Sequence, residues 1–190
     1  MNAAAIDPVS NPTLSSLRVK IGWLCQIIRI VALIYAGWIL LVIVQTWTNE
    51  PALIRNLGAF YGKDLAGMSG FQRAGGFAVY LAVWSPVAGA CYCVWRLFSS
   101  YLDGRIFTVD ATIWLRRVAC FGFASQFIDL AARPLVSLIL TAHLPQADRV
   151  LKVFFSPQDL LHLLFFAGLF ALAHVFKTAA EIAEDNAAIV

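Results

Sequence analysis

Four long runs of apolar residues dominate the chain, and shorter segments with polar, charged, glycine and proline residues separate them. The runs cover about residues 21–44, 75–95, 118–140 and 160–176. An α-helix rises about 1.5 Å per residue, so about 20 apolar residues cross the hydrocarbon core of a bilayer, which is roughly 30 Å thick. The pattern therefore predicts an all-α integral membrane protein with four transmembrane helices.

The segment between the first two apolar runs predicts a short helix on the membrane surface, in the first outer loop. Asn49-Glu50-Pro51 is typical of a helix start, because proline is well tolerated near the first helical position. The glycines between residues 62 and 70 are expected to end this interfacial helix. The apolar residues that fall on roughly one face of it are Ala52, Leu53, Leu57, Phe60 and Tyr61.

Two further helix starts can be recognised from local sequence. Thr108 is a good N-cap, and Asp110 is favourable in the first turn of a helix that runs into the third span. The segment Ser156-Pro157-Gln158-Asp159 combines an N-cap, a proline at the first helical position and an acid placed to complete a capping box. Within the spans, Pro86 and Pro134 are the residues expected to kink or loosen a helix.

The apolar runs also divide the chain into three parts. We assign residues 1–20 to a flexible N-terminal tail, 21–178 to the four-helix transmembrane domain and 179–190 to an acidic cytoplasmic tail. The first 17 residues hold no Lys or Arg, and the first apolar run is too long for the core of a signal peptide. We therefore expect this run to be retained as a membrane anchor. Trp23 and Trp47 lie at its two ends, where interfacial anchors are common.

Composition and charge agree with a membrane location. The chain is 61% hydrophobic and 13% charged, whereas soluble domains carry about 25% charged residues. The net charge of +3 gives little support to a direct nucleic-acid partner. If the N-terminus is inside, more basic residues lie on the cytoplasmic side than on the outer side, which predicts that both termini are cytoplasmic. The cytoplasmic group is Arg18, Lys20, Arg96, Arg105, Arg116, Arg117 and Lys177; the outer group is Arg55, Lys63, Arg73, Arg149 and Lys152.

Charged residues inside the spans are candidates for function, because charge in a membrane is costly. Asp129 and Arg133 lie four residues apart, so they share one face of the third span. Arg29 lies about two turns inside the first span. Two interpretations stay open for these three residues: a buried polar site for an ion or a ligand, or an ion pair that fixes helix packing. Arg29 can alternatively extend its side chain to the inner interface.

The histidines and cysteines give only a weak indication of a metal site. His143 and His162 lie toward the outer side near Asp159, and two histidines with one carboxylate form a possible ligand set for a metal or haem. The four cysteines have neither a Cys-x-x-Cys spacing nor a second pair to complete a zinc site. We expect no cofactor.

Two stretches of the chain carry a resemblance to a known family. They resemble domain-of-unknown-function family 2975, small bacterial inner-membrane proteins, over the C-terminal half and, by hydropathy, over the first span. The resemblance implies a four-helix membrane protein of the bacterial cytoplasmic membrane without an established activity. Some members are encoded beside small helix-turn-helix regulators, which implies a regulatory partner. The stretches are Leu97-Phe98, Gly104, Ile106-Phe107-Thr108 and Leu115-Arg116-Arg117, and then Gly168-Leu169, Leu172-Ala173, Val175-Phe176, Glu184-Asp185-Asn186 and Ile189-Val190.

No enzyme motif is present, since the chain lacks a P-loop, a Gly-x-Gly-x-x-Gly, a Gly-x-Ser-x-Gly and a His-Glu-x-x-His sequence. We therefore expect a non-enzymatic protein that binds a partner, either a regulator or a larger membrane complex, and a homo-oligomer stays possible. One alternative is a small transporter or channel that uses Asp129 and Arg133; another is a haem- or metal-binding membrane protein. The expected partner surface is Arg96, Arg105, Arg116, Arg117, Glu181, Glu184 and Asp185.

Overall fold

The computed structural model describes the backbone of residues 12–104 and 108–188 and the side chains of residues 22–104 and 108–182. All regular structure within these ranges is helical. The α-helices are α1 (Pro12–Thr48), α2 (Glu50–Tyr61), α3 (Gly70–Leu102), α4 (Val109–Thr141) and α5 (Pro157–Ala188), and a 3-10 turn, η1, covers Gln146–Asp148. Four segments are long and apolar enough to cross a membrane: Gly22–Thr48, Gly70–Leu102, Val109–Thr141 and Pro157–Ile182. The predicted fold class is confirmed.

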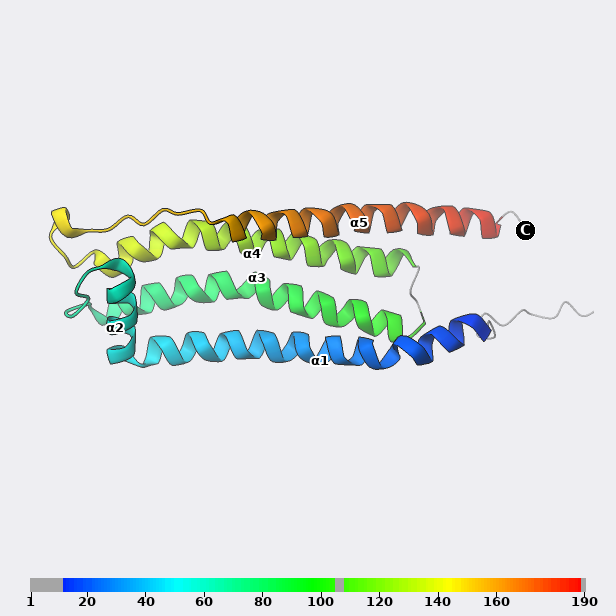
Figure 1. Cartoon of the computed structure of the whole chain (residues 1–190), viewed down its shortest axis with the longest axis horizontal. Coiled ribbons are helices and arrows are strands. Elements are labelled where there is room, and N and C mark those ends of the chain that lie inside the picture. Colours follow the sequence, from blue (N-terminus) through cyan, green and yellow to red (C-terminus); the bar gives the residue numbers. More distant parts are fainter. Residues whose placement is uncertain (1–11, 105–107, 189–190) are drawn as a thin grey trace, which may run out of the picture.

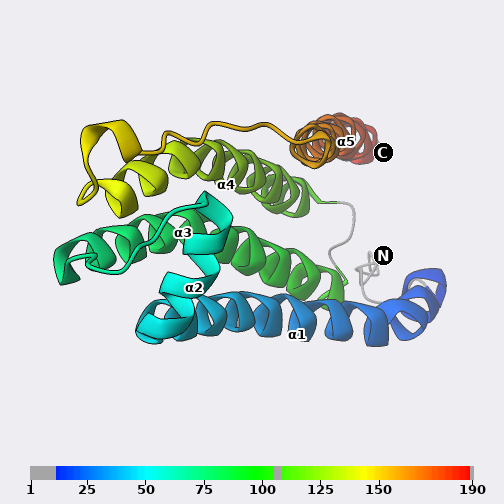
Figure 2. The same ribbon diagram turned by 60° about the vertical axis from the view of Figure 1, so that its left-hand side comes forward.

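The four long helices lie side by side, and successive ones run in opposite directions (Figure 1). Helix α1 packs along α3, α3 along α4, and α4 along α5. Helices α1 and α5 therefore lie at the two edges of the arrangement, with α3 and α4 between them (Figures 1 and 2). The short helix α2 crosses one end of the molecule, which we call the α2 end. The first and last described residues lie at the other end of the molecule, opposite α2 (Figure 1).

Local capping explains where the helices begin. The side chain of Asn49 accepts a hydrogen bond from Ala52 N (3.2 Å), and Thr108 caps α4 in the same way. The predicted box at α5 is present, with Ser156 N bonded to Asp159 Oδ2 (2.7 Å) and Asp159 N to Ser156 Oγ (3.3 Å). A similar box between Ser69 and Gln72 starts α3 and was not predicted.

Helix α1 begins at Pro12, inside the segment assigned to the N-terminal tail. Proline is favourable at the start of a helix, and no other proline or glycine interrupts the sequence before Gly22.

Helix α2 is capped at its end by Gly62, which adopts a left-handed conformation (φ 65°). This conformation stops the helix where the glycine-rich segment begins.

The larger apolar core lies at the α2 end, where α1, α2, α3 and α4 meet. Trp47 is only 5% exposed and packs its ring against Phe77 and Tyr80. The prediction that Trp47 is an interfacial anchor is therefore wrong, because its ring packs into the core against α3. Trp23, at the other end of the span, is 64% exposed.

Large apolar side chains cover the outer surfaces of the edge helices. Trp38 on α1 and Leu161 on α5 are 65% and 63% exposed. A protein in water rarely exposes extended apolar surfaces of this kind, whereas lipid tails solvate them. The exposed faces of the spanning helices are the parts of the molecule that contact lipid.

Candidate functional site

Arg133 on α4 lies between two carboxylates. Its Nη2 lies 2.7 Å from Asp129 Oδ2 on the same helix and 2.6 Å from Asp159 Oδ1 at the start of α5. The guanidinium also donates from Nε to Asp129 Oδ2 (3.1 Å) and from Nη1 to Asp159 Oδ2 (2.8 Å) and Phe154 O (3.0 Å). Arginine has five N–H donors, and these five contacts use all of them.

Asp159 is the most enclosed of the three charged groups. Its side chain is 5% exposed, compared with 17% for Arg133 and 41% for Asp129. Besides Arg133, its oxygens accept hydrogen bonds from Gln126 Nε2 (3.0 Å), Ser156 N (2.7 Å) and Ser156 Oγ (2.9 Å). The position follows from the capping box, which turns the Asp159 side chain back toward the start of α5. Asp159 and Arg133 therefore form a largely buried, bidentate ion pair.

Gln126 extends this network to the next turn of α5. Its Oε1 lies 3.2 Å from His162 Nδ1, while its Nε2 donates to Asp159. The network of Asp129, Arg133, Asp159, Gln126 and His162, which we call the Arg133 network, joins α4 to α5. Asp129 and Arg133 are paired on one face of α4, and the pairing of Arg133 with Asp159 was not predicted.

Two other residues expected near this region lie elsewhere. His143 contacts Gln72, with 3.5 Å between His143 Nδ1 and Gln72 Nε2. Arg29 donates to Gln26 Oε1 (3.2 Å), and its guanidinium lies 4.8 Å from the ring centroid of Trp95. Within the described ranges, no three His, Cys, Asp or Glu side chains are grouped so that they could hold a metal ion.

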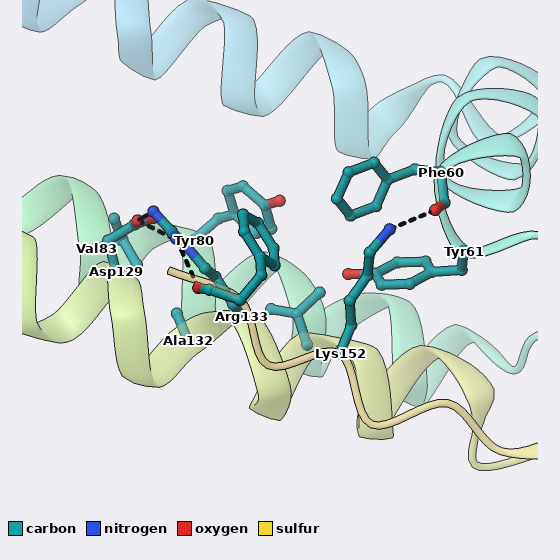
Figure 3. Close-up of a pocket in the computed structure, with 10 residues that line it drawn as sticks. Phe60, Tyr61, Tyr80, Val83, Asp129, Ala132, Arg133 and Lys152 are labelled. Atoms are coloured by element: carbon teal, nitrogen blue, oxygen red, sulfur yellow. Dashed lines mark hydrogen bonds and ion pairs between the residues drawn. The ribbon is translucent and has the colours of Figure 1, made fainter. Parts of the chain in front are cut away.

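Two cavities adjoin the Arg133 network. The smaller one, of about 210 Å³, lies under the α2 end and is bordered by Phe60, Tyr61 and Lys152 (Figure 3). Lys152 Nζ donates to Phe60 O (2.7 Å) and lies 3.5 Å from the centroid of the Phe60 ring. Burial raises the pKa of Tyr61 to about 12. The residues shared with the larger cavity are Tyr80, Val83, Asp129 and Arg133.

The larger cavity, of about 660 Å³, is lined by all four long helices, and we call it the lateral cavity. Both edge helices contribute to its walls, for example Ile39 of α1 and Phe166 of α5. Helices α1 and α5 do not pack along one another in the described part of the chain. The space between them is therefore the side on which no helix of the described chain closes the cavity.

The lateral cavity changes in polarity along its length. Asp129, Arg133, Asp159 and His162 lie in the part of the cavity nearer the α2 end, because α4 runs toward that end and α5 begins beside Arg133 (Figure 1). Farther along the same helices the walls are mainly apolar. The apolar wall residues toward the middle of the spans include Val87, Ala90, Cys91 and Phe166.

Those of the expected partner-binding residues that the structure describes lie at the end opposite α2. Arg96 and Arg117 place their guanidinium groups 5.1 Å and 4.6 Å from the centroid of the Trp114 ring. Arg116 is exposed on α4, and Glu181 pairs with Lys177 at 3.3 Å. Arg105 lies outside the described residues, as do the side chains of Glu184 and Asp185.

Comparison with known proteins places the chain in a family. No curated protein and no solved structure matches it. One family model does match, over residues 8–190, and its description is "Protein of unknown function (DUF2975)". The match covers nearly the whole chain and agrees with the resemblance seen in the sequence. This four-helix, multi-pass membrane protein therefore belongs to the DUF2975 family.

Proposed function

We propose that this protein is a non-enzymatic membrane protein that binds an amphipathic molecule in the lateral cavity. The observation that carries the proposal is a cavity of about 660 Å³ between the two edge helices, polar toward one end and apolar along the rest. Ligand pockets are typically about 300–1,000 Å³, whereas voids left by packing are few and close to the size of a water molecule. A molecule with a polar head and an apolar tail matches this polarity.

The Arg133 network favours a binding site with a fixed polar end, rather than an open path for ions. The two cavities meet at Tyr80, Val83, Asp129 and Arg133, so a path between them has to pass the guanidinium. All five donors of Arg133 are bonded to protein acceptors. Moving this side chain aside would break several charge-assisted hydrogen bonds in a medium of low dielectric constant.

Native mass spectrometry of protein taken from lipid vesicles tests this proposal. Ala90 lines the lateral cavity, and Ala90→Trp is expected to fill it and remove a retained amphiphile that the unmodified protein carries. Ala82→Trp is the matched control, because Ala82 is exposed on the same helix and does not line the cavity. Val87→Trp provides a second filled variant if Ala90→Trp does not fold. Equal retention in the filled and control variants would refute the proposal.

A second candidate function is binding of an acidic protein segment at the end opposite α2. Arg96 and Arg117 are exposed, stack on Trp114, and form no ion pair with a described carboxylate. An excess of basic residues at this end also supports placing both termini in the cytoplasm of a bacterial cell, with the protein in the inner membrane.

Gentle extraction and quantitative mass spectrometry of what co-purifies would test this second function. A stoichiometric partner is expected to be lost from the variant with both Arg96→Ala and Arg117→Ala. Arg55→Ala is the control, since Arg55 is an exposed arginine on α2 at the opposite end. A partner that is retained by the double variant, or lost equally in the control, would contradict binding at this surface.

A further inference from the structure

We infer that the ligand of the lateral cavity carries a positive charge on its polar head, as in a lipophilic amine or a quaternary ammonium amphiphile. This inference rests on the proposed function and adds the chemical class of the ligand. It follows from the charges of the Arg133 network, from the exposure of Asp129 and from the aromatic residues around it.

The network holds one guanidinium and two carboxylates, so it carries a formal charge of −1 when His162 is neutral. Arg133 and Asp159 form a closed pair whose oxygens and N–H groups are all occupied. The two carboxylates share one guanidinium, which leaves one negative charge in excess, and Asp129 is the carboxylate that a ligand can reach. Excess charge is costly in a membrane interior, and a bound cation would offset that cost.

Asp129 is also the more accessible of the two carboxylates in the network. Its side chain is 41% exposed and lines both cavities. Both hydrogen bonds from Arg133 to Asp129 end on Oδ2. Oδ1 has no hydrogen-bond partner among the residues that the structure describes, so it is available to a ligand in the cavity.

An anionic head meets no free lysine or arginine charge at this site. Arg133 has no free N–H, because its five donors already bind protein oxygens. Lys152 borders the smaller cavity but not the lateral cavity, and its ammonium is bonded to Phe60 O. An anion in the lateral cavity would therefore meet Asp129 without a free cation to compensate it.

Aromatic side chains add to the preference for a cation. Tyr80 and Trp84 of α3 and Tyr35 of α1 line the lateral cavity together with Asp129. The faces of such rings attract ammonium groups, most strongly where water is excluded. A carboxylate with aromatic neighbours at the polar end, followed by an apolar wall, matches an ammonium head on an alkyl tail.

Three probes with the same dodecyl chain test the charge preference: dodecyltrimethylammonium, dodecanol and dodecyl sulfate. Full-length protein in phosphatidylcholine nanodiscs is dialysed against each probe, and protein-free nanodiscs correct for partition into lipid. The unmodified protein is expected to bind the cationic probe at least tenfold more tightly than the other two. This comparison needs no variant, so it does not depend on the folding of a mutant.

The variant Asp129→Asn is expected to lose that tenfold preference while it still binds dodecanol. Asp148→Asn is the control, because Asp148 is an exposed carboxylate at the same end that pairs with Lys63 and does not line the lateral cavity. Equal binding of the three probes, or a preference for the sulfate, would overturn the inference and leave the proposed function intact. An absence of saturable binding for all three would overturn both.

Discussion

Arg133 shows how a charged side chain can be accommodated within a membrane-spanning helix. Its five N–H groups all reach oxygens, and two carboxylates from different helices share its charge. Asp159 contributes the more enclosed half of this arrangement, since it is 5% exposed and held by the cap of α5. Asp129 is more exposed and bonds to Arg133 through one oxygen only.

The first prediction concerns this unequal division. Asp159→Asn is expected to lower the unfolding midpoint in detergent by roughly 5 °C or more, because it removes the enclosed counter-ion of Arg133. Asp129→Asn is expected to lower the midpoint less. Adding Arg133→Gln to Asp159→Asn should recover part of the loss, since the enclosed guanidinium is then removed and the remaining charge is on the more exposed Asp129. Equal losses for the two aspartates would contradict the assignment of Asp159 as the main counter-ion.

At the scale of helices, small residues allow α1 and α3 to approach closely. A Cβ atom added to Gly76 on α3 would lie 2.1 Å from Trp47 Cη2 on α1. Trp47 is held between Phe77 and Tyr80, so its ring has little freedom to move. The contact therefore depends on the absence of a side chain at position 76.

The second prediction follows from this contact. Gly76→Ala is expected to reduce the apparent free energy of unfolding by about 1–3 kcal/mol, the usual effect of overpacking. Gly37→Ala is the control, because a Cβ atom there meets nothing within 4 Å. The control should be neutral or slightly stabilising, as alanine favours helix more than glycine does. Unfolding in mixed micelles measures both, and similar values would argue against the close approach.

Local signals predicted the starts of α2, α4 and α5 but missed those of α1 and α3, and long-range contacts were predicted poorly. Asn49, Thr108 and Ser156 were recognised because an N-cap depends on residues a few positions away. The pair of Arg133 and Asp159 joins residues 26 positions apart on different helices, so it depends on how α4 and α5 align. The capping motif did place Asp159 at the start of α5, but it gave no sign of a partner on α4.

The function of Trp47 was mispredicted for a related reason. A tryptophan at the end of an apolar run is typical of an interfacial anchor. Whether its ring packs against a neighbouring helix depends on how α1 and α3 align, which hydropathy does not describe. The interfacial helix itself was predicted, but the burial of Trp47 against α3 was not.

At the scale of the whole molecule, the order in which the helices pack leaves the lateral cavity open between α1 and α5. Each long helix packs along its neighbour in sequence, and the two edge helices do not pack along one another. The even number of spans also brings the described N-terminal and C-terminal ends to the same side (Figure 1). The orientation in the membrane then decides which side the α2 end faces.

The third prediction tests that orientation. In a background without the four native cysteines, Asp64→Cys is expected to react with an impermeant maleimide in intact cells, because residue 64 lies in the loop at the α2 end. Asp185→Cys is expected to be protected until the cells are opened, since the basic residues favour a cytoplasmic C-terminus. The opposite pattern of labelling would reverse the proposed topology.

Photocrosslinking from inside the lateral cavity tests the central claim most directly. A diazirine amino acid is placed at position 87 of the cavity, at lipid-facing position 34 (Ile34, 63% exposed) and at core position 136 (Val136, 3% exposed). After irradiation in native membranes, mass spectrometry identifies the products. We predict lipid or other amphiphile adducts at positions 87 and 34 and none at 136. Crosslinks from position 87 to protein alone, as at position 136, would show that the cavity is closed and would contradict the account.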